Sequence, residues 1–271
     1  MASFVLVPGA WLGGWAWDDV ADRLETRGHE AHPVTLTGLG DRAPLATPDV
    51  DLERHVGDIV DGIVEADLSG LVLVGHSYGG IPVTGAADRI PERIATIVYV
   101  DSGPALDGSA YIDTLPPPVR EATERHVAEE GDGWRLPMPS WEELETLNGA
   151  GLQGLDEETR RRVRERATDH PFRTYTQPIA LKNPARTSLP HVLISCSFPL
   201  EQVREFIDSG HPWFAELGGP QWSFVEMPTS HWPMFSAPDD LARALDGSAP
   251  PDVCSGPRVT SLRRDTSRDG S

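Results

Sequence analysis

A serine with a glycine two residues before it and another two residues after it follows a short apolar run. Ser77 lies between Gly75 and Gly79 in the segment GHSYGG, directly after Leu71–Val74. A strand that turns abruptly into a helix holds its corner residue in a strained backbone conformation, and side chains two positions away would collide. Because glycines avoid that collision, the spacing predicts a hydroxyl exposed above the end of a buried strand, where it can act as a nucleophile.

A serine hydroxyl is a weak nucleophile at neutral pH, so it needs a base within hydrogen-bond reach. The chain has nine histidines. His231 follows the last apolar run and precedes the helical segment Asp239–Leu245, and we predict that it is the base. We expect His211 to be a loop or packing residue, and His76, beside the serine, to shape the cleft.

Negative charge that develops on a substrate carbonyl oxygen needs two amide donors. One comes from the residue after the nucleophile, which is Tyr78, and one from the loop after an early strand. The segment Val7–Trp11 supplies that loop, and we predict Ala10 as its donor.

The elements that must position these residues appear as short apolar runs separated by segments with helical spacing. This alternation predicts an α/β fold with a mostly parallel sheet covered by helices on both faces. The expected strands are Phe4–Val7, Ala31–Leu36, Leu71–Val74, Ile94–Val100, His191–Ser195 and Trp222–Glu226.

The alternation of strand and helix stops after about residue 107 and returns after residue 184. We therefore predict a helical cap over residues 107–184, inserted into a core formed by residues 1–106 and 185–246. From residue 247 to 271 the chain is rich in Ser, Pro, Arg and Asp. Such a segment buries too little apolar surface to offset the cost of ordering its backbone, so we expect a disordered tail.

The excess of acidic residues argues against binding to nucleic acid or to anionic membranes. Twenty-three basic and 42 acidic residues give a formal net charge of -19, which repels nucleic-acid backbones and anionic lipid surfaces. No apolar stretch is long enough for a membrane helix, and the start of the chain lacks the features of a signal peptide. We expect a soluble, cytoplasmic protein that acts on a small molecule without nucleic acid or membrane. Whether it forms a homodimer stays open.

No cofactor or metal is predicted. The two cysteines, Cys196 and Cys254, are far apart and form neither a disulfide framework nor a metal-ligand spacing. We expect Cys196 to be a buried, inert thiol. The segment Gly38–Gly40 lacks the third glycine and the following helix of a dinucleotide site.

Several segments together resemble one branch of the α/β-hydrolases, the branch that contains plant methyl esterases, hydroxynitrile lyases and bacterial esterase relatives. The resemblance extends from about Phe4 to Leu245 and omits most of the insertion and the tail. It implies an eight-stranded sheet, a helical cap, a Ser-His-Asp triad and no cofactor. The segments that carry it are FVLVPGAWLGGWAWDDV, LVLVGHSYGG, IVYVDSGPALDGSA, HPFRTYTQPIAL and SHWPMFSAPDDLARAL.

The chain departs from this branch at the catalytic acid. Members usually carry an aspartate a few residues after the strand that matches His191–Ser195, but the segment Cys196–Glu201 has none. Asp101, after the strand Ile94–Val100, and Glu201 are the two replacements that respect the order serine, acid, histidine. We favour Asp101, while an incomplete triad remains open.

Three functions are therefore open. The first is a serine hydrolase of a carboxylic ester, thioester or lactone. The second is a lyase or cyclase acting on a natural product with His231 as general base, and the third is a binding protein with weak catalysis. Aromatic residues predict an apolar or aromatic substrate, although they fit a cap core equally well. They are Trp134, Trp141, Phe172, Tyr175 and Trp213.

Overall fold

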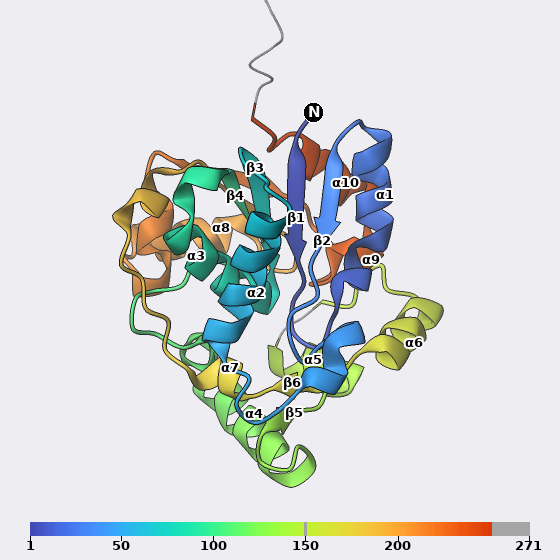
Figure 1. Ribbon diagram of the computed structural model, residues 1–271. Coiled ribbons are helices and arrows are strands. Elements are labelled where there is room, and N and C mark those ends of the chain that lie inside the picture. The colour runs from blue at the N-terminus through green and yellow to red at the C-terminus, as the bar shows by residue number, and fades with distance from the viewer. Residues whose placement is uncertain (149–150, 251–271) are drawn as a thin grey trace, which may run out of the picture.

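The computed structural model describes residues 1–148 and 151–250, and its centre is one parallel sheet (Figure 1). The strands lie in the order β2-β1-β3-β4-β7-β8, and each neighbouring pair is parallel. The inner strands are buried on both faces, which explains their continuous apolar runs. The bounds are β1 Ser3–Val7, β2 Glu30–Pro33, β3 Leu71–His76, β4 Ile94–Val100, β7 His191–Ser195 and β8 Trp222–Glu226.

This sheet confirms the expected α/β class and its mostly parallel strands. The expectation of eight strands was wrong, because the described residues form a six-stranded central sheet. Eight strands came from the resemblance alone, whereas the apolar runs themselves indicated the six strands that form. Edge strand β2 begins and ends earlier than the predicted run Ala31–Leu36.

Helices cover both faces of the sheet. The chain steps from β1 to β2 in one direction and then from β2 to β3 and β4 in the other, so right-handed crossovers place α1 opposite α2 and α3. Helix α2 packs on α3, in front of the sheet in Figure 1, and α1 packs on α10. The bounds are α1 Asp18–Thr26, α2 Leu52–Glu65, α3 Gly80–Arg89, α8 Leu200–Asp208, α9 Pro233–Ser236 and α10 Pro238–Asp246.

Short 3-10 helices complete the connections of the core. Those used below are η3, which follows β3, and η6 and η7, which flank β7 and α8. The bounds are η1 Gly14–Trp17, η2 Gly40–Leu45, η3 Ser77–Gly79, η4 Pro91–Arg93, η6 Pro184–Ser188 and η7 Pro212–Gly218.

Most of the described chain between β4 and β7, from η5 to α7, forms a layer over the carboxyl ends of the strands, at the bottom of Figure 1. The layer is mostly helical, but β5 and β6 form a short antiparallel pair that the sequence did not predict. The bounds are η5 Tyr111–Thr114, α4 Pro117–Glu130, β5 Arg135–Leu136, α5 Trp141–Asn148, α6 Glu157–Arg166, β6 His170–Pro171 and α7 Arg173–Thr176.

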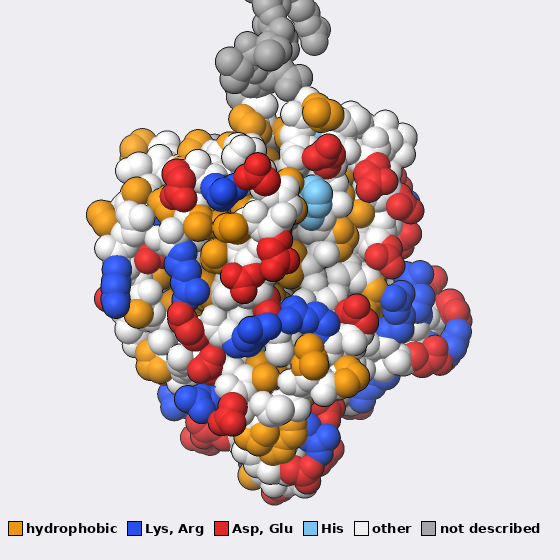
Figure 2. Space-filling view, viewed as in Figure 1, with side chains coloured by type: hydrophobic (Ala, Val, Ile, Leu, Met, Phe, Trp, Pro, Cys, Tyr) orange, Lys and Arg blue, Asp and Glu red, His pale blue; other side chains and the backbone are white. Residues whose placement is uncertain are grey.

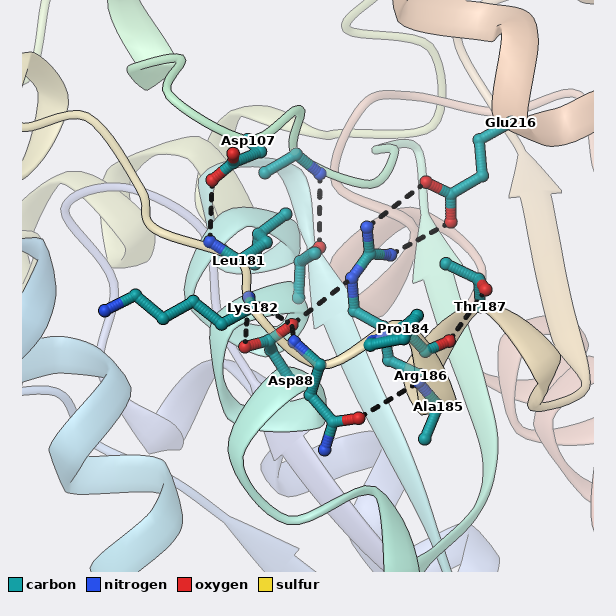
Figure 3. A network of polar contacts seen from close by, with 12 residues as sticks. Asp88, Asp107, Leu181, Lys182, Pro184, Ala185, Arg186, Thr187 and Glu216 are labelled. Carbon is teal, nitrogen blue, oxygen red and sulfur yellow. Dashed lines mark hydrogen bonds and ion pairs between the residues drawn. The ribbon is translucent and has the colours of Figure 1, made fainter.

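The two connections between this layer and the sheet are paired with each other. The amide of Gly108 donates to the carbonyl of Ile179 at 2.8 Å, and the amide of Ile179 donates to the carbonyl of Ser109 at 2.9 Å. The carboxylate of Asp107 also accepts a hydrogen bond from the amide of Leu181 at 2.8 Å (Figure 3). The outgoing and returning segments therefore form one stem.

Asp88, near the end of α3, anchors the returning segment to the core (Figure 3). Its carboxylate accepts hydrogen bonds from the amides of Lys182 and Asn183, both at 2.9 Å. The guanidinium of Arg186 lies 3.8 Å from Asp88 and 3.0 Å from Glu216 in η7. Both Arg186 and Asp88 are buried, so this network connects α3, η6 and η7 away from solvent.

Charged side chains of both signs are interspersed on the face that α2 and α3 occupy, as Figure 2 shows. Within residues 1–148 and 151–250, no helix combines the length and the apolar character that crossing a membrane requires. The predicted disordered tail falls largely on residues 251–271, which lie outside the described residues.

Candidate active site

Ser77 lies at a sharp turn from β3 into η3 and α3. Its backbone has a φ of 51°, in the left-handed region that non-glycine residues seldom adopt. A Cβ atom at Gly75 would come within 2.8 Å of the carbonyl oxygen of Gly79, and one at Gly79 within 2.6 Å of the carbonyl oxygen of Pro8. The two glycines therefore permit the turn itself and the close approach of the loop after β1.

A continuous chain of hydrogen bonds starts at Ser77. Its hydroxyl donates to Nε2 of His231 at 2.9 Å. On the other side of the ring, Nδ1 of His231 donates to Oδ2 of Asp101 at 2.6 Å. The Asp101 side chain is 4% exposed and that of His231 is 21% exposed. The structure thus brings together the serine, histidine and aspartate that the sequence singled out.

Asp101 follows β4 with a φ of 45° and is held from a second strand. Its Oδ1 accepts hydrogen bonds from the amides of Cys196 at 2.8 Å and Ser197 at 3.0 Å, and its Oδ2 accepts one from the Ser197 hydroxyl. Burial alone would raise the pKa of Asp101, but the bonded His231 and these donors lower it below its ordinary value. The carboxylate is therefore ionised and fixed in orientation.

Glu201, the other candidate for the acid, is exposed on the first turn of α8 and forms no hydrogen bond with His231. The residues after β7, where the resemblance places an aspartate, instead supply the donors that hold Asp101.

The loop after β1 passes directly beside the serine. A Cβ atom at Gly9 would lie 2.8 Å from Nδ1 of His76 and 3.1 Å from Cβ of Ser77, so the absence of a side chain at Gly9 favours the close approach of this loop to the nucleophile. Ala10, the next residue, lines a cavity together with Ser77. Tyr78 begins the turn that leads into α3. Both predicted amide donors therefore belong to segments adjacent to the serine hydroxyl.

His76, which was expected to shape the cleft, lines neither cavity at Ser77 and instead contacts the loop that carries His231. Its ring is fully buried, and Nε2 donates to the backbone carbonyl of His231 at 2.7 Å. Burial is the main cause that lowers the pKa of His76 to about 3, and the nearby His231 is the second. The imidazole is therefore neutral and positions the His231 backbone.

Tyr111 is a site residue that sequence reasoning missed. It lies in η5 and lines the cavities on both sides of Ser77. Its ring packs edge-on against Tyr78 and Tyr175, with centroids 5.5 Å and 4.5 Å apart. Burial raises the pKa of the Tyr111 phenol, and its interaction with Ser77 opposes that rise. No sequence motif marks this position, because the contact depends on how the inserted layer folds back.

Two cavities open onto Ser77 and His231. The cap cavity, of about 360 Å³, extends under α4 and includes Ala10 and Tyr175. The aromatic cavity, of about 530 Å³, extends toward α8 and η7 and includes Trp213. Of the aromatic residues predicted to contact substrate, Tyr175 lines the first of these two cavities and Trp213 the second. Trp134, Trp141 and Phe172 line neither, and Trp141 packs instead on Trp232.

No group of three or more His, Cys, Asp or Glu side chains within the described residues has an arrangement that would hold a metal ion. Cys196 is buried. Its burial is the main cause that raises the pKa of its thiol well above the usual range, and the negative charge of Asp101 is the second.

Comparison with known proteins identifies the family. Residues 4–244 match the alpha/beta hydrolase family, and the chain belongs to it. A carbendazim hydrolyzing esterase from Nocardioides sp. strain SG-4G is 34% identical over 255 residues, which cover 90% of this chain and 98% of that protein. Methylesterase 8 of Arabidopsis thaliana is 34% identical over 100 residues, which cover 36% of this chain and 37% of that protein.

A solved structure of an extracellular alpha/beta-hydrolase from a Paenibacillus species superimposes with a TM-score of 0.74. It is 24% identical, with 92% of this chain and 99% of that chain covered, and it supports the fold. The resemblance to plant methyl esterases and bacterial esterases is confirmed. The expected class of enzyme, a carboxylic ester hydrolase of the α/β-hydrolase type, is confirmed by the family and by the esterase names of these relatives.

Proposed function

We propose that the protein hydrolyses a carboxylic ester of a small, uncharged molecule through an acyl-enzyme on Ser77. The observation that carries this proposal is the hydrogen-bonded chain from Ser77 through His231 to Asp101, with distances of 2.9 Å and 2.6 Å. This order of groups activates a serine in unrelated hydrolases. The relative from Nocardioides is named for hydrolysing an ester, which supports the same reaction class.

In the first half of the reaction, Oγ of Ser77 attacks the ester carbonyl carbon while its proton passes to Nε2 of His231. The amides of Ala10 and Tyr78 donate to the oxyanion that forms. When the carbonyl re-forms, the bond to the alcohol oxygen breaks and His231 gives its proton to that oxygen. The acyl group then remains on Ser77 and the alcohol leaves.

In the second half, water attacks the acyl carbon and transfers a proton to His231. Collapse of this intermediate breaks the bond to Ser77, whose oxygen regains the proton as the carboxylic acid leaves. Asp101 keeps Nδ1 of His231 protonated, so that Nε2 is free to accept the serine proton, and it stabilises the imidazolium formed in each half.

The lyase and binding-protein alternatives depended on the missing acid after β7. The contact between Asp101 and His231 removes that motive, and we do not propose either of them.

Labelling with a fluorophosphonate tests the proposal. Such a probe reacts with an activated serine and adds its mass to the residue that carries the nucleophile. We expect one adduct on the peptide that contains Ser77, and none in Ser77→Ala or in protein unfolded with urea. Label elsewhere in native protein, or turnover of p-nitrophenyl acetate retained by Ser77→Ala, would contradict the mechanism.

A further inference from the structure

The cap cavity and the aromatic cavity meet at the reacting groups. Both are lined by Ser77, His231 and Tyr111. An ester bound with its carbonyl carbon at Ser77 therefore has a separate space available for each of its two halves. The two spaces differ in their chemistry.

The wall of the aromatic cavity consists of stacked rings from the loop after β7, α8 and η7. Phe206 packs on Phe214 with centroids 4.9 Å apart and on Phe198 at 6.1 Å. His211 adds a further ring 5.2 Å from Phe206, and Trp213 completes the lining. A volume of about 530 Å³ lies in the range of small-molecule sites. Its shape and composition suit a ring that stacks on other rings.

Most polar side chains in the aromatic cavity are already bonded to the protein, but Nδ1 of His211 is buried without a hydrogen-bond partner among the described residues. Asp101 is the only carboxylate among its lining residues, no Lys or Arg lines it, and Asp101 is occupied by His231 and the donors after β7. The Ser102 hydroxyl donates to the carbonyl of Ser77 at 2.6 Å, and the Thr114 hydroxyl to that of Tyr111 at 2.7 Å. A ring without polar groups therefore leaves few hydrogen bonds unmade in this cavity, and the one open position is Nδ1 of His211.

The cap cavity also carries rings, including those of Trp11, Tyr175 and Trp232, but it differs from the aromatic cavity in its charged residues. Three carboxylates line it, those of Glu129, Glu130 and Glu143, against one guanidinium from Arg125. Nδ1 of His126 lies 3.4 Å from Glu130. This excess of negative charge disfavours an anionic group, whereas a small neutral group meets no such repulsion.

The wall of the aromatic cavity is fixed to the core. Glu216 lies in the same 3-10 helix as Trp213 and Phe214, and it pairs with the buried Arg186 at 3.0 Å (Figure 3). Arg186 in turn faces Asp88 at 3.8 Å. Because this wall is anchored before any ligand arrives, binding a ring there costs little ordering of the protein.

We propose that the aromatic cavity is the subsite for an uncharged aromatic ring of the substrate, and that the cap cavity takes the smaller, non-anionic half of the ester. This inference rests on the proposed ester hydrolysis and adds the identity of one half of the substrate. The ring belongs to either the alcohol or the acyl half, and the two arms of the experiment distinguish these.

Ketones that replace the ester oxygen by a methylene group test binding without hydrolysis. In 4-phenyl-2-butanone, the analogue of benzyl acetate, the ring lies on the side of the alcohol, and in 1-phenyl-1-propanone, the analogue of methyl benzoate, it lies on the side of the acyl group. Titration calorimetry compares both with 2-butanone, which has no ring. We expect at least one phenyl ketone to bind about tenfold or more tightly than 2-butanone, because its ring buries apolar surface against the wall.

Two matched variants locate the binding. Trp213 lines the aromatic cavity, whereas Trp134 lines neither cavity, and both are half-buried. Trp213→Ala should weaken the tighter phenyl ketone about fivefold to tenfold, while Trp134→Ala should change its affinity less than about twofold. Phe198→Leu gives the same test through a smaller change if circular dichroism shows that Trp213→Ala does not fold.

Equal affinities for the phenyl ketones and 2-butanone would overturn the inference, and so would equal effects of the two tryptophan variants. Either result leaves ester hydrolysis at Ser77 intact. Conversely, if the ring binds at Trp213 but no fluorophosphonate reacts with Ser77, the proposed function fails and the ring subsite stands.

Discussion

The backbone amide of Cys196 donates to the carboxylate of Asp101 at 2.8 Å, so the end of β7 holds an acid that β4 carries. Together with the amide of Ser197, this contact fixes the carboxylate on the side of His231 away from Ser77. The acid is thus displaced by one strand along the sheet, while its hydrogen bond to the imidazole is retained.

Replacing the acid tests its role. Asp101→Asn keeps the size of the side chain but favours the wrong imidazole tautomer, and we expect kcat for p-nitrophenyl acetate to fall by roughly 10³-fold to 10⁴-fold. Glu201→Gln, at the exposed alternative position, should alter kcat by less than about twofold. Initial-rate kinetics on both variants measure this. Comparable losses of kcat in Asp101→Asn and Glu201→Gln would exclude Asp101 as the orienting acid.

Gly79→Ala should damage both stability and activity. The added methyl group would lie 2.6 Å from the carbonyl oxygen of Pro8, so the loop that carries Ala10 must shift, at a cost of about 1–3 kcal/mol in the free energy of unfolding. In Gly62→Ala, on α2, the added methyl meets no atom within 4 Å. This control should be stabilising by up to about 1 kcal/mol. Urea denaturation and kcat measurements check both variants.

The buried ion network of Figure 3 should contribute strongly to stability. Arg186→Met leaves Asp88 and Glu216 without their cation, and the free energy of unfolding should fall by about 3 kcal/mol or more. Arg243→Met removes an exposed pair with Asp240 and should cost less than about 0.5 kcal/mol. Equal urea midpoints for the two variants would contradict the expected larger loss of unfolding free energy in Arg186→Met.

Buried His55 should make stability depend on pH. Burial lowers its pKa to about 4 in the folded protein, against the ordinary 6.5. Between these values the unfolded chain binds the extra proton, so this stabilisation is complete above pH 6.5 and is lost as the pH falls toward 4. At pH 5 the loss is about 2 kcal/mol. His55→Gln should therefore reduce the difference in unfolding free energy between pH 7.5 and pH 5. An unchanged difference would argue against a neutral His55.

The central strands were predictable because buried parallel strands carry continuous β-branched runs. The inner strands from Ile94 and His191 begin and end where the sequence indicated, and so does the edge strand from Trp222. Edge strand β2 gave a weaker pattern, because none of its four residues is fully buried. The pair of β5 and β6 has two residues in each strand, which is too short for any periodicity to appear.

For the site, local motifs indicated Ser77 and His231, because the turn and the late loop each need particular neighbours. The sequence favoured Asp101 over Glu201, but it did not reveal that amides following β7 hold this carboxylate, a contact across 95 residues of chain. Tyr111 carries no local signature at all. The aromatic residues of the inserted layer, such as Trp141 and Tyr175, were equally hard to assign. Composition alone does not reveal which rings face a cavity and which pack on each other.

The paired stem at Gly108 and Ile179 also affects how easily the inserted layer above the active site can change in length. Since the two ends of the inserted layer already lie within hydrogen-bond reach, the entropic cost of closing a different insertion there grows slowly with its length, by about 0.6 kcal/mol per doubling. We therefore expect this position to tolerate insertions of other lengths while the sheet beneath it stays the same.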